Sequence, residues 1–164
     1  MADHPLDPSG TAGGSAAPAP VRVLIVDDHR LMRSGLRAAL VREPGFDAVG
    51  EAATAEEAVP LARILRPDVV LMDLEMPGAG GLAGIAMLRQ LDVVPRVLMV
   101  SMHAAPEAAR QALAAGAAGY VLKGTAHATL APALRRVADG GVWVDPVLGL
   151  DAVGPPVRPS ATAS

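Results

Sequence analysis

The sequence predicts an α/β protein built on a parallel β-sheet, with a helix after each strand. Short apolar runs recur along the chain, and segments with helical periodicity separate them, which is the βα alternation of a parallel sheet. The runs are continuous in Val, Leu, Ile and Met, as expected for strands buried on both faces. Several runs end abruptly in an acidic, basic or hydroxyl residue. Together these patterns predict a doubly wound sheet with polar groups along one edge.

Five strands and five helices are expected. The strands are expected at 21–26, 47–50, 68–72, 96–100 and 119–122. The helices are expected near 30–42, 55–65, 81–91, 105–115 and 126–139. Residues 1–20 are rich in Ala, Gly, Pro and Ser and are expected to be disordered. Residues 21–145 should form the domain, and residues 146–164 a flexible tail or linker remnant.

The first two helices carry clear local signals. In the first, Met32, Leu36 and Leu40 are spaced four residues apart and form one apolar face that can pack on the sheet. The second opens with Thr54, followed three residues later by Glu57. This is the pattern of a capping box, which satisfies free backbone N–H groups at a helix start.

Glycines and prolines mark the later helices. Gly116 follows the fourth helix and Gly140 the fifth, and both are suitable C-terminal stops. Pro106 suits the first turn of the fourth helix. Pro60 and Pro132 fall within the second and fifth helices, where proline removes a hydrogen bond and clashes with the preceding turn. We therefore expect a kink, a late start or a shortened helix at each of these two.

Composition excludes several classes of function. The 164-residue chain is about one domain long and contains no cysteine, which excludes disulfides, thiolate metal sites and cysteine nucleophiles. A net charge of −3 and a single Phe, Tyr and Trp give neither a basic nucleic-acid footprint nor base-stacking platforms. The apolar runs are far shorter than the roughly 18 residues of a membrane helix, and no secretory signal opens the chain. A soluble cytoplasmic protein without membrane contact is expected.

The polar residues at the strand ends are expected to form the functional site. They are Asp27 and Asp28 after the first run, Asp73 after the third, Ser101 after the fourth and Lys123 after the fifth. The carboxyl ends of parallel strands share one edge, where open α/β sheets bind ligands. Oxygen ligands without soft donors favour Mg²⁺, or Mn²⁺, together with a phosphate. A carboxylate beside such a cation and a lysine can attack phosphorus and form an aspartyl phosphate.

Each of these residues also has a simpler interpretation. Aspartates at strand ends commonly cap the next helix, and Ser101 alone would be read in the same way. A single lysine is usually a solvated loop residue, and Tyr120 can be a packed aromatic. The joint occurrence of the set favours a functional site. His29 and His103 are expected to face solvent, and no metal role is expected because their spacing forms no ligand set.

Three segments resemble the receiver domain of bacterial two-component response regulators. They are Ile25–His29, Leu71–Gly78 and Gly116–Lys123. The resemblance covers about residues 21–145, in the order and spacing of that family. Three further segments resemble its NarL/FixJ (LuxR-type) branch, namely Val49–Ala52, Ser101–His103 and Ala138–Trp143. The resemblance implies a flavodoxin-like (βα)5 receiver fold with five parallel strands in the order 2-1-3-4-5.

The resemblance also implies a role for each acidic residue. Asp73 would be the phosphoacceptor for a histidine kinase, and Lys123 would pair first with Asp73 and then with the phosphoryl oxygens. Asp28 would bind Mg²⁺ directly and Asp27 through water, with Asp73 and the backbone carbonyl of Glu75 as further ligands. These roles describe a phosphoacceptor switch and not a turnover enzyme.

A second set of implied roles concerns switching and phosphate lifetime. Ser101 would move to bond a phosphoryl oxygen, and Tyr120 would turn inward into the space vacated. Glu75 and His103 would flank the entrance of the hydrolytic water and tune the phosphate lifetime. Many receivers have a proline in a cis bond where this chain has Gly124. A non-proline cis bond costs about 2.5–4 kcal/mol, so a trans peptide is expected.

The implied partners are a sensor histidine kinase and an unknown output protein. The output surface would be the fourth helix, fifth strand and fifth helix, or the first and fifth helices in a homodimer. The branch normally carries a C-terminal helix-turn-helix domain, but nothing after residue 145 can build a recognition helix, so no nucleic-acid contact is expected. The chain is expected to be either a stand-alone receiver acting through protein contacts or a truncated transcriptional regulator without its effector domain. The rival functions are a phosphorylation-independent interaction module and a small phosphatase with an aspartyl nucleophile.

Overall fold

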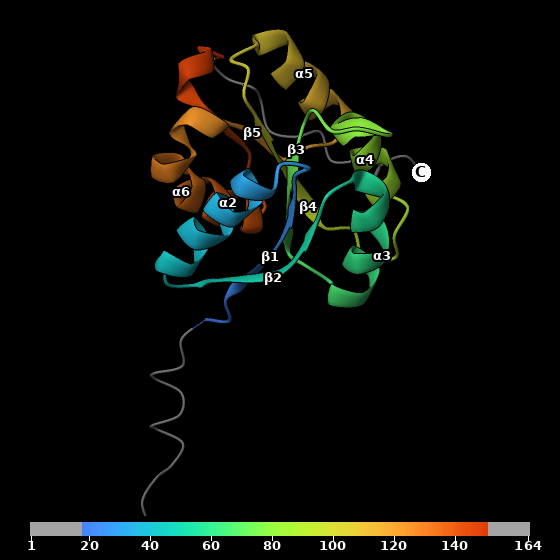
Figure 1. Ribbon diagram of the computed structural model, residues 1–164. Helices are drawn as coiled ribbons and strands as arrows, with labels where there is room; N and C mark the ends of the chain where they lie inside the picture. The colour runs from blue at the N-terminus through green and yellow to red at the C-terminus, as the bar shows by residue number, and fades with distance from the viewer. Residues whose placement is uncertain (1–17, 151–164) are drawn as a thin grey trace, which may run out of the picture.

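The computed structural model describes residues 18–150 and contains a six-stranded parallel sheet between two layers of helices (Figure 1). The strands are β1 Val21–Val26, β2 Phe46–Ala52, β3 Val69–Asp73, β4 Arg96–Ser101, β5 Gly119–Leu122 and β6 Trp143–Val144. The helices are α2 Arg30–Arg42, α3 Ala55–Leu65, α4 Gly80–Leu88, α5 Pro106–Ala115 and α6 Ala126–Ala138. Most of the predicted N-terminal extension and C-terminal tail lies outside the described residues.

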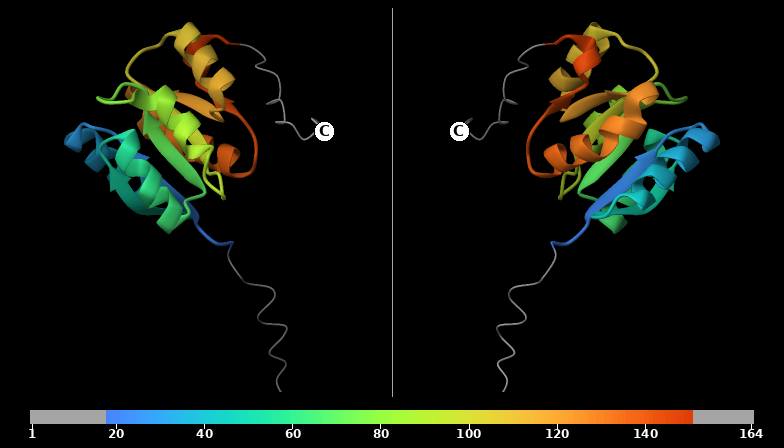
Figure 2. Two further views of the ribbon diagram at one scale, coloured as in Figure 1. Left: turned by 90° about the vertical axis from the view of Figure 1, so that its right-hand side faces the viewer. Right: turned by 90° about the vertical axis from the view of Figure 1, so that its left-hand side faces the viewer.

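The order of the strands is β2-β1-β3-β4-β5-β6, which confirms the predicted 2-1-3-4-5 order and adds a sixth strand. Helices α3, α4 and α5 cover one face of the sheet, and α2 and α6 cover the other. The two views of Figure 2 present these faces in turn. No helix among residues 18–150 combines the length and the apolar character needed to cross a bilayer.

The two helical layers exist because alternate residues of the central strands point to opposite faces. Val23 and Ile25 of β1 pack under α2 and α6, while Leu24 and Val26 pack under the other layer. All four side chains are buried. This explains why the strands read as unbroken apolar runs, and it confirms a sheet buried on both faces.

The sixth strand corrects the prediction of a five-stranded sheet. β6 has only two residues, too few to show any hydrophobic period, so the sequence pattern could not reveal it. It is recognised by its backbone bonds to β5: Trp143 N–H donates to the Ala118 carbonyl at 3.1 Å, and Asp145 N–H donates to the Tyr120 carbonyl at 2.9 Å. β6 therefore joins the end of the domain to the strand that precedes Lys123.

Ordered structure continues beyond residue 145. Pro146–Leu148 form a 3-10 turn, and Leu148 is buried in the core that faces α3, α4 and α5. Asp145 caps this turn by accepting a hydrogen bond from Val147 N–H at 3.1 Å. The sequence pattern does not reveal this turn, because three residues are too few to give a periodic signal. The described part of the domain thus includes Pro146–Leu148.

Neither helix-internal proline starts its helix late or shortens it. α3 runs through Pro60 and α6 through Pro132 within one residue of the predicted bounds. Both prolines lie on exposed faces, so the carbonyl that each leaves without a helical partner can bond to water. The neighbouring inward residues, such as Ala58 and Ala133, are fully buried and hold the helices in place.

Gly119 should be intolerant of a side chain because β6 lies against it. A Cβ at this position would lie 2.5 Å from the Trp143 carbonyl oxygen and 2.7 Å from Leu98 Cδ1. Gly119→Ala should therefore lower the free energy of unfolding by about 1–3 kcal/mol, as overpacking does, in a urea titration. Gly35→Ala is the matched control, because its Cβ would meet nothing within 4 Å and alanine favours a helix by about 0.5–1 kcal/mol. Equal stability of the two variants would contradict the close β5–β6 contact.

Candidate functional site

The carboxyl ends of β1, β3, β4 and β5 bring the five predicted polar residues to one edge of the sheet. Lys123 lies between two carboxylates, with its Nζ 2.9 Å from Asp27 Oδ2 and 3.3 Å from Asp73 Oδ2. All three side chains are at most 4% exposed. Ser101, at the end of β4, is also buried. The predicted convergence of these residues is therefore present in the structure.

Backbone N–H groups orient the two buried carboxylates. Glu75 N–H donates to Asp73 Oδ1 at 3.2 Å, and His29 N–H donates to Asp27 Oδ1 at 2.8 Å. In both cases the donor lies two residues beyond the aspartate. An Asp side chain commonly forms a local turn with its own backbone in this way. Each aspartate uses its second oxygen for Lys123. The carboxylates are thus fixed by their own chain on one side and by a cation on the other.

The loop that carries Lys123 is fixed by a buried carboxylate that the sequence analysis missed. Asp145 Oδ2 accepts hydrogen bonds from Leu122 N–H at 3.2 Å and from Thr125 Oγ1 at 2.7 Å. Lys123–Thr125 form a 3-10 turn between these two contacts. None of the described peptide bonds is cis, so the bond before Gly124 is trans, as expected.

Arg33 supports the site from α2 and was also missed from sequence. Its Nη1 donates to the Asp27 carbonyl at 2.6 Å, and its Nε lies 3.2 Å from Glu51 Oε1. Arg37 Nη1 contacts the other oxygen of Glu51 at 2.9 Å. This network ties the end of β1 to α2 and β2. Its signal in the sequence is one arginine among several, with nothing local to single it out.

The charge on Asp73 is set by burial and by its neighbours. Burial and the charge of the nearby Asp27 raise the pKa of Asp73, and Lys123 and the Glu75 N–H group lower it by less. The result is a pKa of about 6 for Asp73. Burial alone would lower the pKa of Lys123, but the hydrogen bond to Asp27 and the charges of Asp73 and Asp27 outweigh it and raise that pKa. The ammonium therefore stays charged and only partly offsets the acidic group.

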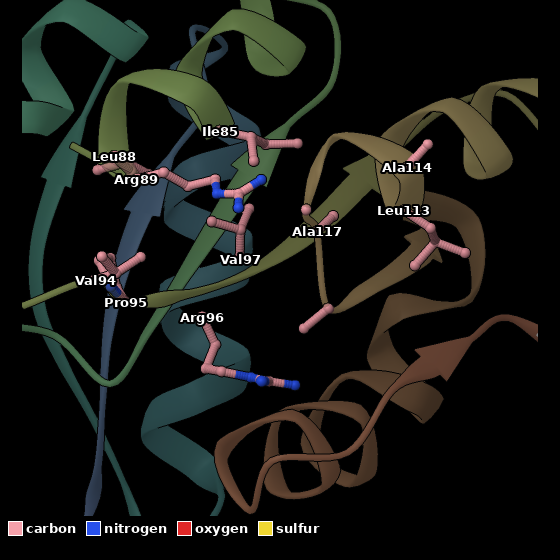
Figure 3. A pocket seen from close by; sticks show the side chains of 12 residues that line it. Ile85, Leu88, Arg89, Val94, Pro95, Arg96, Val97, Leu113, Ala114 and Ala117 are labelled. Atoms are coloured by element: carbon pink, nitrogen blue, oxygen red, sulfur yellow. The ribbon is translucent and has the colours of Figure 1, made fainter. Parts of the chain in front are cut away.

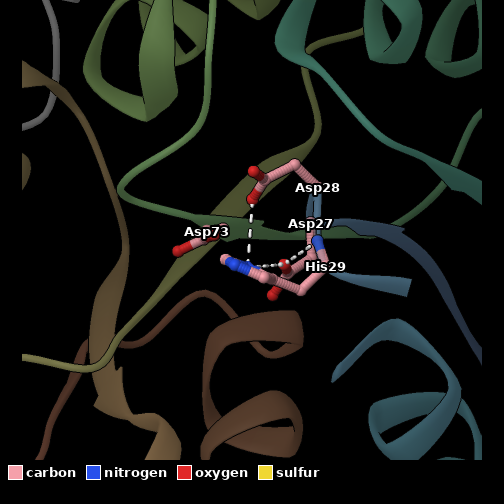
Figure 4. A group of neighbouring side chains, drawn as sticks. All are labelled: Asp27, Asp28, His29 and Asp73. Carbon is pink, nitrogen blue, oxygen red and sulfur yellow. Dashed lines mark hydrogen bonds and ion pairs between the residues drawn. The ribbon is translucent and has the colours of Figure 1, made fainter. Parts of the chain in front are cut away.

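The acidic group fits a divalent cation. One ligand atom each from Asp27, Asp28, His29 and Asp73 lies within 4.8 Å of the others (Figure 4). Asp28 Oδ1 is buried, and no hydrogen bond satisfies it, so a cation could take it as a ligand. Hard carboxylate oxygens are the ligands that Mg²⁺ and Mn²⁺ prefer. The predicted carboxylates are together, and His29 joins them although no metal role was expected of it.

His29 is solvent-facing, as expected, since its side chain is 70% exposed. Its Nδ1 nevertheless lies 3.2 Å from Asp28 Oδ1 and 3.4 Å from Asp27 Oδ1. Exposure and proximity to the carboxylates are compatible because the imidazole covers the outer side of the site. The prediction considered only spacing between histidines and missed that one histidine directly follows two site aspartates.

The residues at the end of β4 are linked to Tyr120. His103 N–H donates to Ser101 Oγ at 3.0 Å, and the His103 carbonyl accepts a hydrogen bond from the Tyr120 hydroxyl at 3.1 Å. Tyr120 is fully buried, and burial raises the pKa of its hydroxyl more than the Ser101 hydroxyl lowers it. The ring thus already points inward in this structure and is attached to the loop that Ser101 begins.

The side chains of Glu75 and His103 meet above the site. Their Oε1 and Nε2 atoms are 2.8 Å apart, although both side chains are more than 60% exposed. The backbone N–H of each donates to a site residue, Asp73 for Glu75 and Ser101 for His103. The pair therefore bridges the ends of β3 and β4 on the solvent side of the phosphoacceptor candidate.

A hollow of about 530 Å³ lies at the other end of β4, between α4 and α5 (Figure 3). Its lining includes Arg96 and Val97, the first residues of β4, so it is at the edge opposite Ser101. Arg89 extends across it and donates from Nη1 to the Ala115 carbonyl at 3.2 Å. That contact stabilises the C-terminus of α5, and the hollow is not part of the acidic site.

Comparisons with known proteins agree with this site. Residues 23–135 match the response regulator receiver domain family. The chain is 40% identical to the response regulator GacA of Pseudomonas viridiflava over 126 residues, which cover 77% of this chain and 59% of GacA. It is 35% identical to the response regulator UvrY of Escherichia coli (strain K12) over 144 residues, 88% of this chain and 66% of UvrY.

A solved structure is similar as well. It is a two-component response regulator of the LuxR family from Aurantimonas sp. SI85-9A1, with a TM-score of 0.76 and 39% identity over 80% of this chain and 94% of that one. The chain spans less than two thirds of the length of GacA and of UvrY. Sequence, fold and acidic edge agree, and the chain therefore belongs to the response regulator receiver domain family, in its NarL/FixJ-type branch.

Proposed function

We propose that Asp73 accepts a phosphoryl group from a histidine kinase in the presence of Mg²⁺, and that the new charge switches the protein between two conformations. The observation that carries this proposal is the position of the Lys123 ammonium, within 3.3 Å of carboxylate oxygens on both Asp27 and Asp73. A buried lysine beside a strand-end aspartate supplies the positive charge that a transferred phosphoryl group needs.

The transfer step uses Asp73 as nucleophile. A carboxylate oxygen attacks phosphorus of a phosphohistidine or an acyl phosphate, and the P–N or P–O bond of the donor breaks with its electron pair leaving to the donor. Lys123 then exchanges its contact with Asp73 for one with a phosphoryl oxygen. Bound Mg²⁺, held by Asp28 and by Asp27 through water, with Asp73 and the Glu75 carbonyl as further ligands, would neutralise charge on the phosphoryl oxygens.

The switch is proposed to pass from Ser101 to Tyr120. Ser101 Oγ would move to a phosphoryl oxygen, and the His103 segment would move with it because His103 N–H is bonded to that oxygen. The Tyr120 hydroxyl is bonded to the same segment through the His103 carbonyl. These bonds support a two-state element that phosphorylation can bias through Ser101. Tyr120 already points inward in this structure, so the expected inward turn of the ring is not the step that phosphorylation adds.

The output is proposed to be a protein contact, with no catalytic turnover. Two surfaces are available, one formed by α5, β5 and α6 and the other by α2 and α6 in a homodimer. Leu31 and Val41 are largely exposed on α2 and give the second surface apolar area. A cytoplasmic location fits a partner kinase. If the protein is a piece of a longer NarL/FixJ-type regulator, the same surfaces would act on its effector domain.

Removal of the phosphoacceptor should abolish labelling. Incubation with Mg²⁺ and acetyl phosphate should add one phosphoryl group to the wild-type protein, and the intact mass should return to its starting value as the group hydrolyses. Asp73→Asn should show no mass gain, because an amide is not nucleophilic at phosphorus. Asp47→Asn, at an exposed position of β2, is the matched control and should label like the wild type.

The rival functions give different results in the same assay. Full labelling of Asp73→Asn would contradict the proposal by placing the phosphoryl group on another residue. No labelling of the wild type would contradict it as well and leave a phosphorylation-independent interaction module. Continuous turnover of a generic phosphate ester, without a stable mass gain, would indicate a phosphatase.

The raised pKa of Asp73 should make the stability of the domain depend on pH. The folded protein loses this proton at a pH of about 6 and the unfolded chain at about 3.8. Between these values the unfolded chain binds fewer protons, so the free energy of unfolding falls as the pH rises, by at most about 3 kcal/mol for this group. Without divalent cations, Asp73→Asn should therefore be more stable than the wild type at pH 7.5, and the difference should shrink at pH 4. Parallel stability curves for the two proteins between pH 4 and 7.5 would contradict the assigned charge.

The Glu75–His103 pair should slow hydrolysis of the phosphorylated state. The pair covers the solvent side of Asp73, where the hydrolytic water would enter, so Glu75→Ala or His103→Ala should speed decay without preventing labelling. An exposed polar contact contributes at most about 1 kcal/mol, which limits the change to about fivefold. The control is Glu107→Ala, which breaks a similarly exposed pair with Arg110 on α5. Unchanged decay in both site variants would refute the assigned role.

A further inference from the structure

The imidazole of His29 lies at the outer side of the acidic group, beside two carboxylates that belong to different residues (Figure 4). Its Nδ1 is 3.2 Å from Asp28 Oδ1 and 3.4 Å from Asp27 Oδ1. In an octahedral site each ligand atom lies about 2.1 Å from the cation, so two adjacent ligand atoms are about 3 Å apart. The imidazole nitrogen thus lies where a neighbouring ligand of the same cation would lie.

The contacts of His29 favour ligation over ordinary structural roles. His29 is the N-cap residue of α2, yet its side chain makes no capping hydrogen bond. Its backbone N–H is bonded to Asp27 Oδ1 at 2.8 Å, which fixes the residue against the site. Asp28 Oδ1 is buried without a hydrogen-bond partner although the imidazole nitrogen is adjacent. The ring therefore makes no capping bond to the helix, and its close polar contacts are with the two carboxylates of the site.

We propose that His29 Nδ1 is a ligand of the divalent cation next to the carboxylate of Asp28. This proposal deepens the proposed function, because it concerns the same metal site. It gives the site one imidazole nitrogen among oxygens. Imidazole suits Ni²⁺, Zn²⁺ and Fe²⁺, whereas Mg²⁺ prefers oxygen ligands. The histidine should therefore select for nitrogen-binding metals without being needed for Mg²⁺.

Metal titrations of the untagged protein test this selectivity. At pH 8, where an ordinary imidazole is neutral, calorimetry with Mg²⁺ and with Ni²⁺ is compared for the wild type, His29→Ala and His127→Ala. His127 is an exposed histidine on α6 that is not part of the acidic group, and it serves as the control. His29→Ala should lose about tenfold or more in Ni²⁺ affinity, with Mg²⁺ affinity unchanged within about twofold. His127→Ala should match the wild type for both metals.

A spectroscopic measurement tests the ligand itself. Cu²⁺, a paramagnetic metal that imidazole suits, should show ¹⁴N coupling in electron spin-echo experiments when bound to the wild type. The coupling should be absent in His29→Ala and present in His103→Ala. Coupling that survives in His29→Ala, or an equal change in Ni²⁺ and Mg²⁺ affinity on its substitution, would overturn the proposal. If Mg²⁺ binds normally in that case, only the role of His29 fails. If no divalent cation binds the wild type, the metal requirement of the proposed function fails as well.

Discussion

The ion pairs of Lys123 are the interaction on which the functional edge depends. Its ammonium contacts Asp27 and Asp73 within 3.3 Å, in a place where none of the three side chains is more than 4% exposed. Burial and the neighbouring charge of Asp27 raise the pKa of Asp73, and a cation is needed to stabilise the two carboxylates together. The pKa of Asp73 still remains raised, to about 6. One lysine is therefore not enough, and the site retains an attraction for a second positive charge.

The position of that lysine depends on the end of the domain. Asp145 follows β6 and bonds to both sides of the turn that holds Lys123. β6 itself is held to β5 through the Ala118 and Tyr120 carbonyls. The described segment after α6, residues 139–150, thus contributes to the chemistry by fixing the loop that carries Lys123. A change in the packing of this segment would therefore change the position of Lys123 in the site.

Local patterns predicted the fold well because a sheet buried on both faces leaves unbroken apolar runs, and parallel strands send their ends to one edge. The five central site residues followed from that rule. What the sequence could not reveal depends on contacts between distant segments: a two-residue strand at Trp143, the hydrogen bonds of Asp145 and the support from Arg33. Pro60 misled because a local rule on helix breaking ignores whether the ring faces solvent. The position of His29 beside the carboxylates was missed because only the spacing between histidines was considered, and not its place directly after Asp27 and Asp28.

The central claim is that the carboxylate held by Lys123 at the end of β3 becomes an acyl phosphate. The most direct measurement is reductive trapping: the protein is incubated with Mg²⁺ and acetyl phosphate, treated with borohydride, and mapped by peptide mass spectrometry. The account predicts conversion of Asp73 alone to homoserine, because only an acyl phosphate is reduced under these conditions. Conversion at Asp27 or Asp28 instead, or no converted residue in a protein that has gained phosphoryl mass, would contradict it.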